Sequence, residues 1–503
     1  MDIFSNLIMG FHVAFSPMNL WMCFVGVLIG TLIGVLPGIG PTTGVAILIP
    51  ITFGMDATTA IITMCGVYYG AMYGGSTTSI LLNVPGESSS VMTTLDGYQM
   101  AKKGRPGPAL GMAALSSFIA GTFAVLMLTF LSPPLANYAV SFGPPEYFAL
   151  TFMGLTLVTS LGGDSPLKGL ISGVFGLLVA CIGIDAQSAV ARFTFGSMSL
   201  LDGVGFIGVA VGLFAAAEVL VNIEEPMLQI FTEAKLTIRS LLPNLQDWKD
   251  SFGALWRGSI IGFFVGVLPG AGATIASFMA YAVEKKVSKH PELFGTGVIE
   301  GVAAPEGANN AAAGGALVPL LTLGIPGSGT TAVMLGALMI HGLRPGPMLF
   351  SSRPDFVWGL IASMYIGNVM LIILNMPMIG LWVRLLKVPY KVLMPLIITI
   401  SAVGVFATDN NIFDMWVMAV FGVIGYLMKK LDYPAAPAVL ALVLGPMVEM
   451  SLRQSLTISH GNLSIFFTRP ISGTLTVIAI LSLFAPFLRI LWKKYRAGKT
   501  AAA

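Results

Sequence analysis

Charged residues are scarce in this chain. Only 10% of the 503 residues are Asp, Glu, Lys or Arg, whereas 55% are hydrophobic. A soluble globular chain carries about 25% charged residues, so a chain this apolar cannot cover its own surface in water. The net charge of +3 is also too small to indicate a nucleic-acid partner. The composition therefore excludes an ordinary soluble protein and favours one whose surrounding solvent is the lipid bilayer.

Cysteine, histidine and enzyme motifs are also sparse. The three cysteines lie in apolar stretches without a CxxC pair, and the four histidines show no ligand spacing. Such cysteines are typical of small buried side chains rather than of disulfides or metal ligands. No HExxH, GxSxG or complete GxGxxG occurs, and residues 498–500 lack the spacing of a Walker A motif. The sequence thus predicts neither an enzyme nor a bound cofactor.

Basic residues are missing from the N-terminal segment. The first Lys or Arg is Lys102, whereas a secretory signal peptide needs a basic region ahead of its apolar core. We therefore expect the first apolar segment to be retained as a membrane helix.

Apolar segments recur from end to end. About 20 apolar residues suffice for a helix to cross a bilayer. Strong candidates lie near 109–131, 146–162, 167–184, 200–221, 356–383, 392–408, 411–428 and 470–490. Shorter or interrupted segments lie near 18–36, 40–54, 59–82, 254–268, 272–284, 305–323, 328–341 and 434–448. The expected fold is an all-α integral membrane protein with roughly 12–14 transmembrane or re-entrant helices.

The order of these segments predicts the domain organisation. A first repeat half with discontinuous helices, and the transmembrane helices after it, is expected over 18–221. The longest polar stretch, 222–252, mixes charged with apolar residues and is typical of an amphipathic connector, with a regulatory loop as the alternative. A second repeat core is expected over 254–383 and C-terminal transmembrane helices over 392–490, followed by a basic cytoplasmic tail, 491–503.

An internal repeat is the most informative feature of the sequence. The motif Gly-Val-Leu-Pro-Gly-x-Gly occurs at 34–40 and again at 266–272. Further glycines precede both copies at the same spacing, namely Gly26, Gly30, Gly258 and Gly262. Two more matched motifs follow in the same order, at 83–86 and 105–108 in the first copy and at 324–327 and 344–347 in the second. Three matches in order favour a true duplication over chance similarity.

The basic residues indicate how the copies are oriented. Short loops rich in Lys and Arg remain cytoplasmic. Loop 52–59 has no basic residue, whereas its counterpart carries Lys285, Lys286 and Lys289; after the second motif the bias reverses in favour of the first copy. Equivalent loops are thus expected on opposite sides, as in transporters with inverted-topology repeats. The sequence leaves open whether the LPGxG segments cross the membrane or form re-entrant hairpins, and on which side the N-terminus lies.

The proline-glycine motifs predict a binding site. Proline removes a backbone donor and glycine lets the chain unwind, and the freed polar groups must be buried in protein or line a wet cavity. Amides at such a break favour a carboxylate, and small hydroxyl or amide side chains can assist. Ordinary structural kinks are the alternative, which the paired arrangement disfavours. The expected substrate-binding residues are Pro37, Gly38, Gly40, Thr42, Thr43, Asn83, Pro85, Gly86, Ser88, Ser89, Pro269, Gly270, Gly272, Thr274, Asn309, Asn310, Pro326, Gly327, Ser328 and Thr330.

The remaining candidate residues give weaker indications of function. The four glycines ahead of the breaks are expected to form close helix contacts. Glu87, Glu300 and Glu306 lie near the breaks, but a coupling role is not favoured for any acidic residue, because carbonyls and hydroxyls alone can hold sodium. The sequence does not determine which residues would bind a metal ion. A coupling sodium is expected near Gly38, Asn83, Gly270 and Pro326.

The motifs resemble those of a known family. GVLPGIGPTT at 34–43, YGAMYGGSTT at 69–78 and NVPGE at 83–87 look like the large membrane subunit of the tripartite tricarboxylate transporters, the TctA-type permeases. PEGANNAA at 305–312 and GIPGS at 324–328 are similar to the second-half motifs of that family, and the resemblance runs from about residue 20 to the end.

The resemblance implies a multi-pass protein of the bacterial inner membrane that imports a carboxylate, such as citrate or a related tricarboxylate, by sodium or proton symport. It also implies a small TctB-type membrane subunit and a periplasmic TctC-type solute-binding protein. We expect alternating access of a mobile unit that carries the broken helices, with an elevator-type movement by analogy only. A channel for small anions, or an intramembrane lipid-modifying enzyme, is the alternative. Solute counterflow would distinguish a transporter from a channel, and lipid turnover would test the enzyme.

Overall fold

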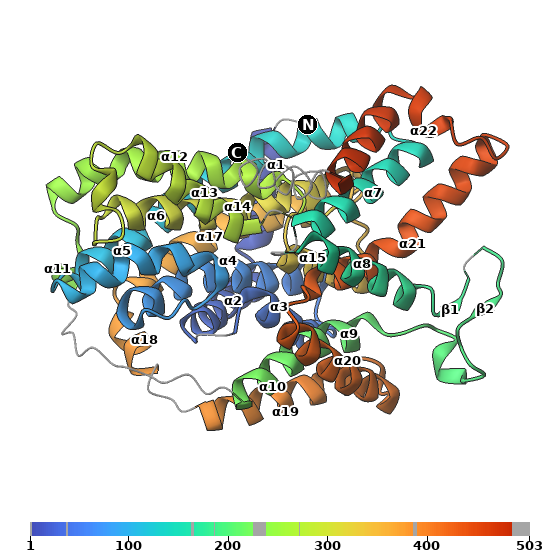
Figure 1. Cartoon of the computed structure of the whole chain (residues 1–503), viewed down its shortest axis with the longest axis horizontal. Helices are drawn as coiled ribbons and strands as arrows, with labels where there is room; N and C mark the ends of the chain where they lie inside the picture. The colour runs from blue at the N-terminus through green and yellow to red at the C-terminus, as the bar shows by residue number, and fades with distance from the viewer. Residues whose placement is uncertain are drawn as a thin grey trace, which may run out of the picture.

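The computed structural model describes residues 3–36, 39–161, 165–185, 187–224, 238–270, 272–385 and 390–484. In this part of the chain helices dominate, and the strands β1 and β2 form one short hairpin. Figure 1 shows that long helices such as α4 and α12 run roughly along the longest axis of the molecule. The predicted tail 491–503 and part of the predicted connector lie outside the described residues.

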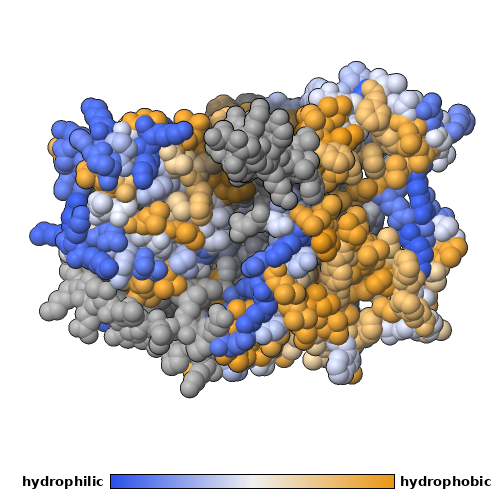
Figure 2. All heavy atoms as spheres, in the orientation of Figure 1, coloured by the Kyte–Doolittle hydropathy of each residue, from blue (hydrophilic) through white to orange (hydrophobic). Residues whose placement is uncertain are grey.

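Six described helices are long and apolar enough to cross a membrane, which confirms the expected all-α membrane fold: Pro17–Val35, Pro106–Ala139, Phe206–Glu224, Pro354–Asn375, Ile412–Lys430 and Ala435–Ile458. Six shorter apolar helices accompany them: Ile3–Ala14, Pro41–Thr52, Pro166–Ala180, Gly329–Ile340, Met394–Ala407 and Pro470–Phe484. Apolar side chains cover much of the face seen in Figure 2, with hydrophilic residues gathered toward both ends of the long axis.

Many helices before the connector begin at a proline or after a capping side chain. Proline suits the first helical turn because its missing N–H is not needed there, and α2, α3, α6 and α8 all begin with it. The elements are α1 (Ile3–Ala14), α2 (Pro17–Val35), α3 (Pro41–Thr52), α4 (Ala57–Leu82), η1 (Ser88–Ser90), α5 (Val91–Lys102), α6 (Pro106–Ala139), α7 (Pro144–Leu161), α8 (Pro166–Ala180), β1 (Gly183–Ile184), β2 (Ala191–Arg192), η2 (Met198–Leu200), α9 (Phe206–Val211), η3 (Gly212–Ala216) and α10 (Ala217–Glu224).

The elements of the second half begin within the predicted connector. Within the predicted connector, α11 is a single short turn and α12 already begins at Leu245, where Asn244 caps it by accepting from the amide of Asp247 at 2.8 Å. The elements are α11 (Ile238–Leu241), α12 (Leu245–Val267), α13 (Gly272–Val287), η4 (Pro291–Leu293), α14 (Glu300–Leu323), α15 (Gly329–Ile340), α16 (Leu349–Ser352), α17 (Pro354–Asn375), α18 (Ile379–Leu385), α19 (Tyr390–Asp409), α20 (Ile412–Lys430), α21 (Ala435–Ile458) and α22 (Ile465–Thr468).

The predicted glycine contacts are present in both copies. Helix α2 packs on α4, and α12 packs on α14. A side chain in place of Gly26, Gly30 or Gly34 would collide with the backbone of α4, and one in place of Gly258, Gly262 or Gly266 would collide with that of α14. Small residues thus bring two helix backbones together, as in other membrane proteins.

Helices α4 and α14 form the centre of the molecule. Nearly every residue of both is buried, as expected for helices that are apolar all round. Each ends with a left-handed residue, Asn83 (φ 58°) or Gly324 (φ 71°), and a proline-glycine pair follows. The two copies therefore share their local structure, while their inverted orientation in the membrane remains a prediction.

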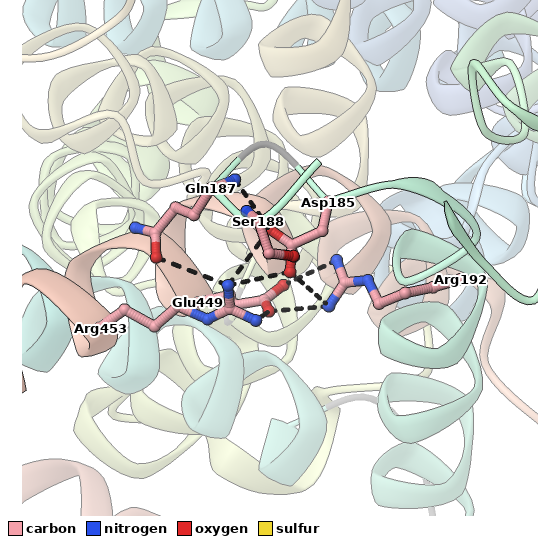
Figure 3. Close-up of polar contacts among 6 residues, drawn as sticks. All are labelled: Asp185, Gln187, Ser188, Arg192, Glu449 and Arg453. Atoms are coloured by element: carbon pink, nitrogen blue, oxygen red, sulfur yellow. Dashed lines mark hydrogen bonds and ion pairs between the residues drawn. The ribbon is translucent and has the colours of Figure 1, made fainter. Parts of the chain in front are cut away.

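Residues 183–203, apart from 186, form an arm that projects beside α21 (Figure 1). Its two strands pair Gly183 with Arg192 and Ile184 with Ala191. Ion pairs tie it to α21: Asp185 lies 2.9 Å from Arg453, and Arg192 lies 2.8 Å from Glu449 (Figure 3). The arm is therefore fixed to the helix by alternating charges.

Candidate functional site

Four helix starts meet around one cavity of about 730 Å³. Helix α3 begins at Pro41, α13 at Gly272 and α15 at Gly329, while η1 begins at Ser88. Each start lies directly after one of the four proline-glycine breaks. Local sequence explains this, because proline and glycine end the preceding helix and allow a new one to begin at an angle.

Hydroxyl pairs join the two copies across the cavity. The Oγ1 atoms of Thr42 and Thr330 are 2.9 Å apart, which links the first break to the fourth. The Oγ atom of Ser88 lies 2.9 Å from Oγ1 of Thr274, which links the second break to the third. The cavity is thus built from both repeats.

Backbone groups add a third link between the breaks. The amide of Gly270 donates to the carbonyl of Gly327 at 3.1 Å. Ser328 caps α15 by accepting from the amide of Thr331 at 3.3 Å, and its hydroxyl lies 3.1 Å from the hydroxyl of Tyr68. Ser328 therefore lies between the N-terminus of α15 and the central helix α4.

The cavity wall has an unusual charge distribution. Its polar side chains are hydroxyls, and Glu87 supplies the carboxyl group, while no Lys, Arg or His is present among the described lining residues. Positive potential comes instead from helix N-termini, which carry about half an elementary charge each and favour anions. The described residues contain no group of three or more His, Cys, Asp or Glu that could hold a metal ion.

Many of the predicted binding residues lie in this wall. They are Gly40, Thr42, Ser88, Gly270, Gly272, Thr274, Ser328 and Thr330. The residues that contribute no lining surface are Thr43, Asn83, Pro85, Gly86, Ser89, Pro269, Asn309, Asn310, Pro326 and Gly327. Pro37 and Gly38 lie outside the described residues.

The residues outside the wall have other contacts. Asn83 is exposed in the left-handed position that ends α4, a conformation asparagine tolerates better than most residues. Gly86 packs against the backbone of Gly34 and Gly75, where a side chain would collide. Both shape the break without reaching the cavity.

Asn309 and Asn310 belong to a buried network around Glu306. The carboxylate of Glu306 accepts from Oγ of Ser76 at 2.6 Å, from Nδ2 of Asn309 at 3.2 Å and from the hydroxyl of Thr93. Asn310 donates to Ser117 at 2.7 Å. The network joins α4, α5, α6 and α14 and satisfies polar groups that are otherwise costly to bury.

Several lining residues escaped the sequence analysis. Tyr68 and Met72 come from α4, and Phe278 and Met279 from α13. The available signal was that Met72 lies inside the YGAMYGGSTT motif, that Tyr68 directly precedes it, and that Phe278 and Met279 follow Thr274 by about one helical turn. Pro434 and Ala436 come from the start of α21, far along the chain, where nothing in the sequence marks them as part of the cavity.

Comparison with known sequences decides the family. The profile described as "Tripartite tricarboxylate transporter TctA family" matches residues 20–440. The chain belongs to this family. The match includes both repeat copies and all four breaks, so the cavity is a feature of a TctA-family membrane protein, and this family is a family of transporters.

Two relatives come from Agrobacterium vitis. The "Uncharacterized 52.8 kDa protein in TAR-I ttuC' 3'region" is 48% identical over 480 residues, which cover 95% of each chain. The "Uncharacterized protein in TAR-II ttuC' 3'region" is 45% identical over 227 residues, or 45% of this chain and 94% of the relative. No solved structure matches the chain.

Proposed function

We propose that the protein is the membrane subunit of an ion-gradient-driven importer, and that the cavity at the four breaks binds a carboxylate. The observation that carries this proposal is the convergence of the N-termini of α3, α13 and α15 on a hydroxyl-lined cavity. Amides at helix starts bind anions without a buried cationic side chain, and membership of the TctA family makes a tricarboxylate such as citrate the first substrate to test.

The hydroxyl pairs suit a carboxylate ligand. Thr42 with Thr330, and Ser88 with Thr274, are hydrogen-bonded to each other. Each hydroxyl carries one donor, so an entering carboxylate can replace the partner hydroxyl as acceptor. Binding would thereby separate or reorient pairs that now hold the two repeats together, which couples occupancy to the relative position of the repeats.

The partners and location belong to the same proposal. A tripartite family implies further subunits, for which we propose a small TctB-type membrane protein and a periplasmic TctC-type binding protein that delivers the carboxylate. We place the complex in the bacterial inner membrane with the C-terminus of this chain in the cytoplasm, following the positive-inside rule. The coupling ion is sodium or a proton.

Thr330→Val tests the site in proteoliposomes that contain the chain with its small subunit and binding protein. This change keeps the shape of the side chain and removes the hydroxyl that faces Thr42. Loss of one hydrogen bond to a charged ligand is worth about 1.5–3 kcal/mol, so the KM for radiolabelled citrate should rise roughly tenfold or more. Thr322→Val is the matched control, because Thr322 bonds only its own helix, at the carbonyl of Val318.

Four outcomes are informative. Uptake under an imposed sodium or proton gradient, with a raised KM in Thr330→Val alone, supports the function and the site. Uptake of malate or succinate instead of citrate keeps the site and changes the substrate. Equal KM values in both variants would remove the cavity as the binding site, and gradient-independent flux without counterflow would favour the anion channel.

A further inference from the structure

Glu87 is the acidic side chain that the chain places in the cavity wall. It stands between Gly86, which ends the second break, and Ser88, whose hydroxyl faces Thr274 across the cavity. Its residue is only 6% exposed. A carboxyl group thus lines the cavity in which, under the proposed function, a carboxylate anion binds.

The partners of Glu87 are neutral. Its carboxylate accepts from the amide of Ser89 at 3.4 Å and from the hydroxyl of Ser89. Its Cγ lies where a side chain at Gly75 would be, so it packs closely on α4. No ion pair to Glu87 exists among the described residues. An ionised carboxylate buried without a cation is costly, and such groups tend to become neutral by binding a proton.

Among the described residues, no cationic side chain is paired with Glu87, so the helix N-termini at the cavity are the source of positive potential near it. Tyr68 of α4 and Glu306 of α14 are the titratable groups that face it. Helix α2 carries no charged residue. Charged residues on α5 and α13 lie further along these helices: Asp96 bonds Tyr281, Glu284 pairs with Arg257, and Lys102, Lys285 and Lys286 are exposed at the helix ends. The charged side chains on these elements therefore place no full positive charge beside Glu87, and only the partial charge of helix N-termini offsets its ionised form.

We propose that Glu87 is the proton-binding residue that couples carboxylate import to the proton gradient. The inference rests on the proposed function, because it requires an anion in the cavity. An anion beside an ionised Glu87 is repelled, whereas a neutral Glu87 removes the repulsion and can donate a hydrogen bond to the anion. Anion and proton therefore favour each other's binding, by equal factors in both directions.

The coupling step needs no further reactant. On the outward-facing side, Glu87 takes a proton from water as the carboxylate enters. After the repeats change position, the anion leaves to the cytoplasm and Glu87 releases its proton to cytoplasmic water. The empty carrier then returns with Glu87 ionised in the water-filled cavity, and Glu87 takes its next proton from the outside. The hydroxyl of Ser89 can serve either state, because it donates to a carboxylate and accepts from a carboxylic acid.

Uptake of radiolabelled citrate by the reconstituted complex tests this proposal. The membrane potential is clamped at zero, and the outside is made one pH unit more acidic without sodium. For one coupled proton, accumulation in the wild type should rise about tenfold per pH unit. Glu87→Gln, which mimics the neutral acid, should lose this rise while it still exchanges internal for external citrate. Glu292→Gln is the matched control, because Glu292 is exposed in the short helix η4, outside the cavity wall.

A second measurement needs no variant. Calorimetry of citrate binding to the wild-type complex, in two buffers with different heats of ionisation and at a pH where free citrate is fully ionised, reports proton uptake directly. Where Glu87 of the empty cavity is already neutral, binding takes up no proton, so the titration is repeated at rising alkaline pH until this group ionises. We expect net proton uptake on binding in that range; no uptake at any pH would overturn the role of Glu87. Sodium-driven uptake that is equal in wild type and Glu87→Gln would overturn it too and leave the proposed function standing. Absence of any carboxylate uptake in the wild type would instead overturn the proposed function, and this inference with it.

Discussion

Asp185 in the arm and Glu87 in the cavity are both buried carboxylic acids, but their surroundings differ. Asp185 is 5% exposed and has Arg192 and Arg453 beside it (Figure 3). Glu87 is 6% exposed and has only neutral donors. In the arm, the buried charge of Asp185 holds structure together and is paired with arginine. An unpaired acid at a ligand cavity is the kind of group whose proton can be used for function.

Substitution of Glu306 is expected to cause the largest loss of stability. Glu306 too has no ion-pair partner in the part of the chain that the structure describes, but it accepts from Ser76, Thr93 and Asn309. Glu306→Leu leaves these donors without an acceptor, at about 1–3 kcal/mol for each donor, so the free energy of unfolding should fall by about 3 kcal/mol or more. Glu306→Gln keeps an acceptor and should cost about 1 kcal/mol.

Thermal denaturation of the purified variants, followed by size-exclusion chromatography, measures these costs. Leu and Gln differ little in volume, so Gln controls for packing. Equal stability of the two variants would mean that hydrogen bonds to Glu306 contribute little, and that the network is not needed to hold the four helices together.

Acid pH should release the arm. The amide of Gln187, together with Ser188 and Arg453, holds the pKa of Asp185 well below the ordinary value for aspartate, against the opposing effect of burial. A lowered folded-state pKa gives stability that is present above the unfolded value, about 3.9, and is lost as pH falls through the folded value. The arm should therefore stay attached at pH 5 and loosen only well below pH 4, roughly.

A nitroxide at Phe195→Cys, in a Cys181→Ser background, reports this release, because Phe195 is 88% exposed at the outer part of the arm. Asp185→Asn should give a mobile spectrum already at pH 7, whereas Asp202→Asn, a change at an exposed site on the same arm, should not. An immobile Asp185→Asn spectrum would show that the arm does not depend on this ion pair.

The ion pair between Arg353 and Asp355 is expected to have the smallest effect on stability. Their ion pair is 3.4 Å long, and both side chains are about half exposed (45% and 51%). Exposed pairs are worth about 0–1 kcal/mol, so Arg353→Gln should shift the thermal midpoint little and leave citrate uptake unchanged. A loss as large as that of Glu306→Leu would point to a further contact made by Arg353 in the full complex.

The sequence predicted the features that depend on local chemistry. A helix ends shortly before each of the four breaks, so these breaks and the hydroxyls after them, such as Thr42 and Thr274, could be assigned to one site from the paired repeat motifs. The glycine contacts of α2 and α12 followed from periodicity in the same way.

Features that depend on side-chain direction were not predictable. Asn83 precedes a break as closely as Ser88 follows it, yet the left-handed turn leaves Asn83 away from the cavity. Glu87 was not favoured as a coupling residue, because carbonyls and hydroxyls alone can hold sodium. Its place in the cavity wall depends on how η1 packs against α4 and α13, which no local pattern encodes. Pro434 and Ala436 reach the wall through contacts between α15 and α21 that no local pattern encodes.

The glycine contacts also limit how this molecule can move. Where the backbone of α2 touches α4 through Gly26, Gly30 and Gly34, there is no compressible layer of side chains between them. Neither helix can slide past the other by less than a full glycine spacing without a collision. We therefore expect α2 with α4, and α12 with α14, to behave as two rigid bars. The contacts that can then change during transport would be the hydrogen bonds between single hydroxyl groups of the two repeats. A bound solute can break these hydrogen bonds without deforming either pair of helices.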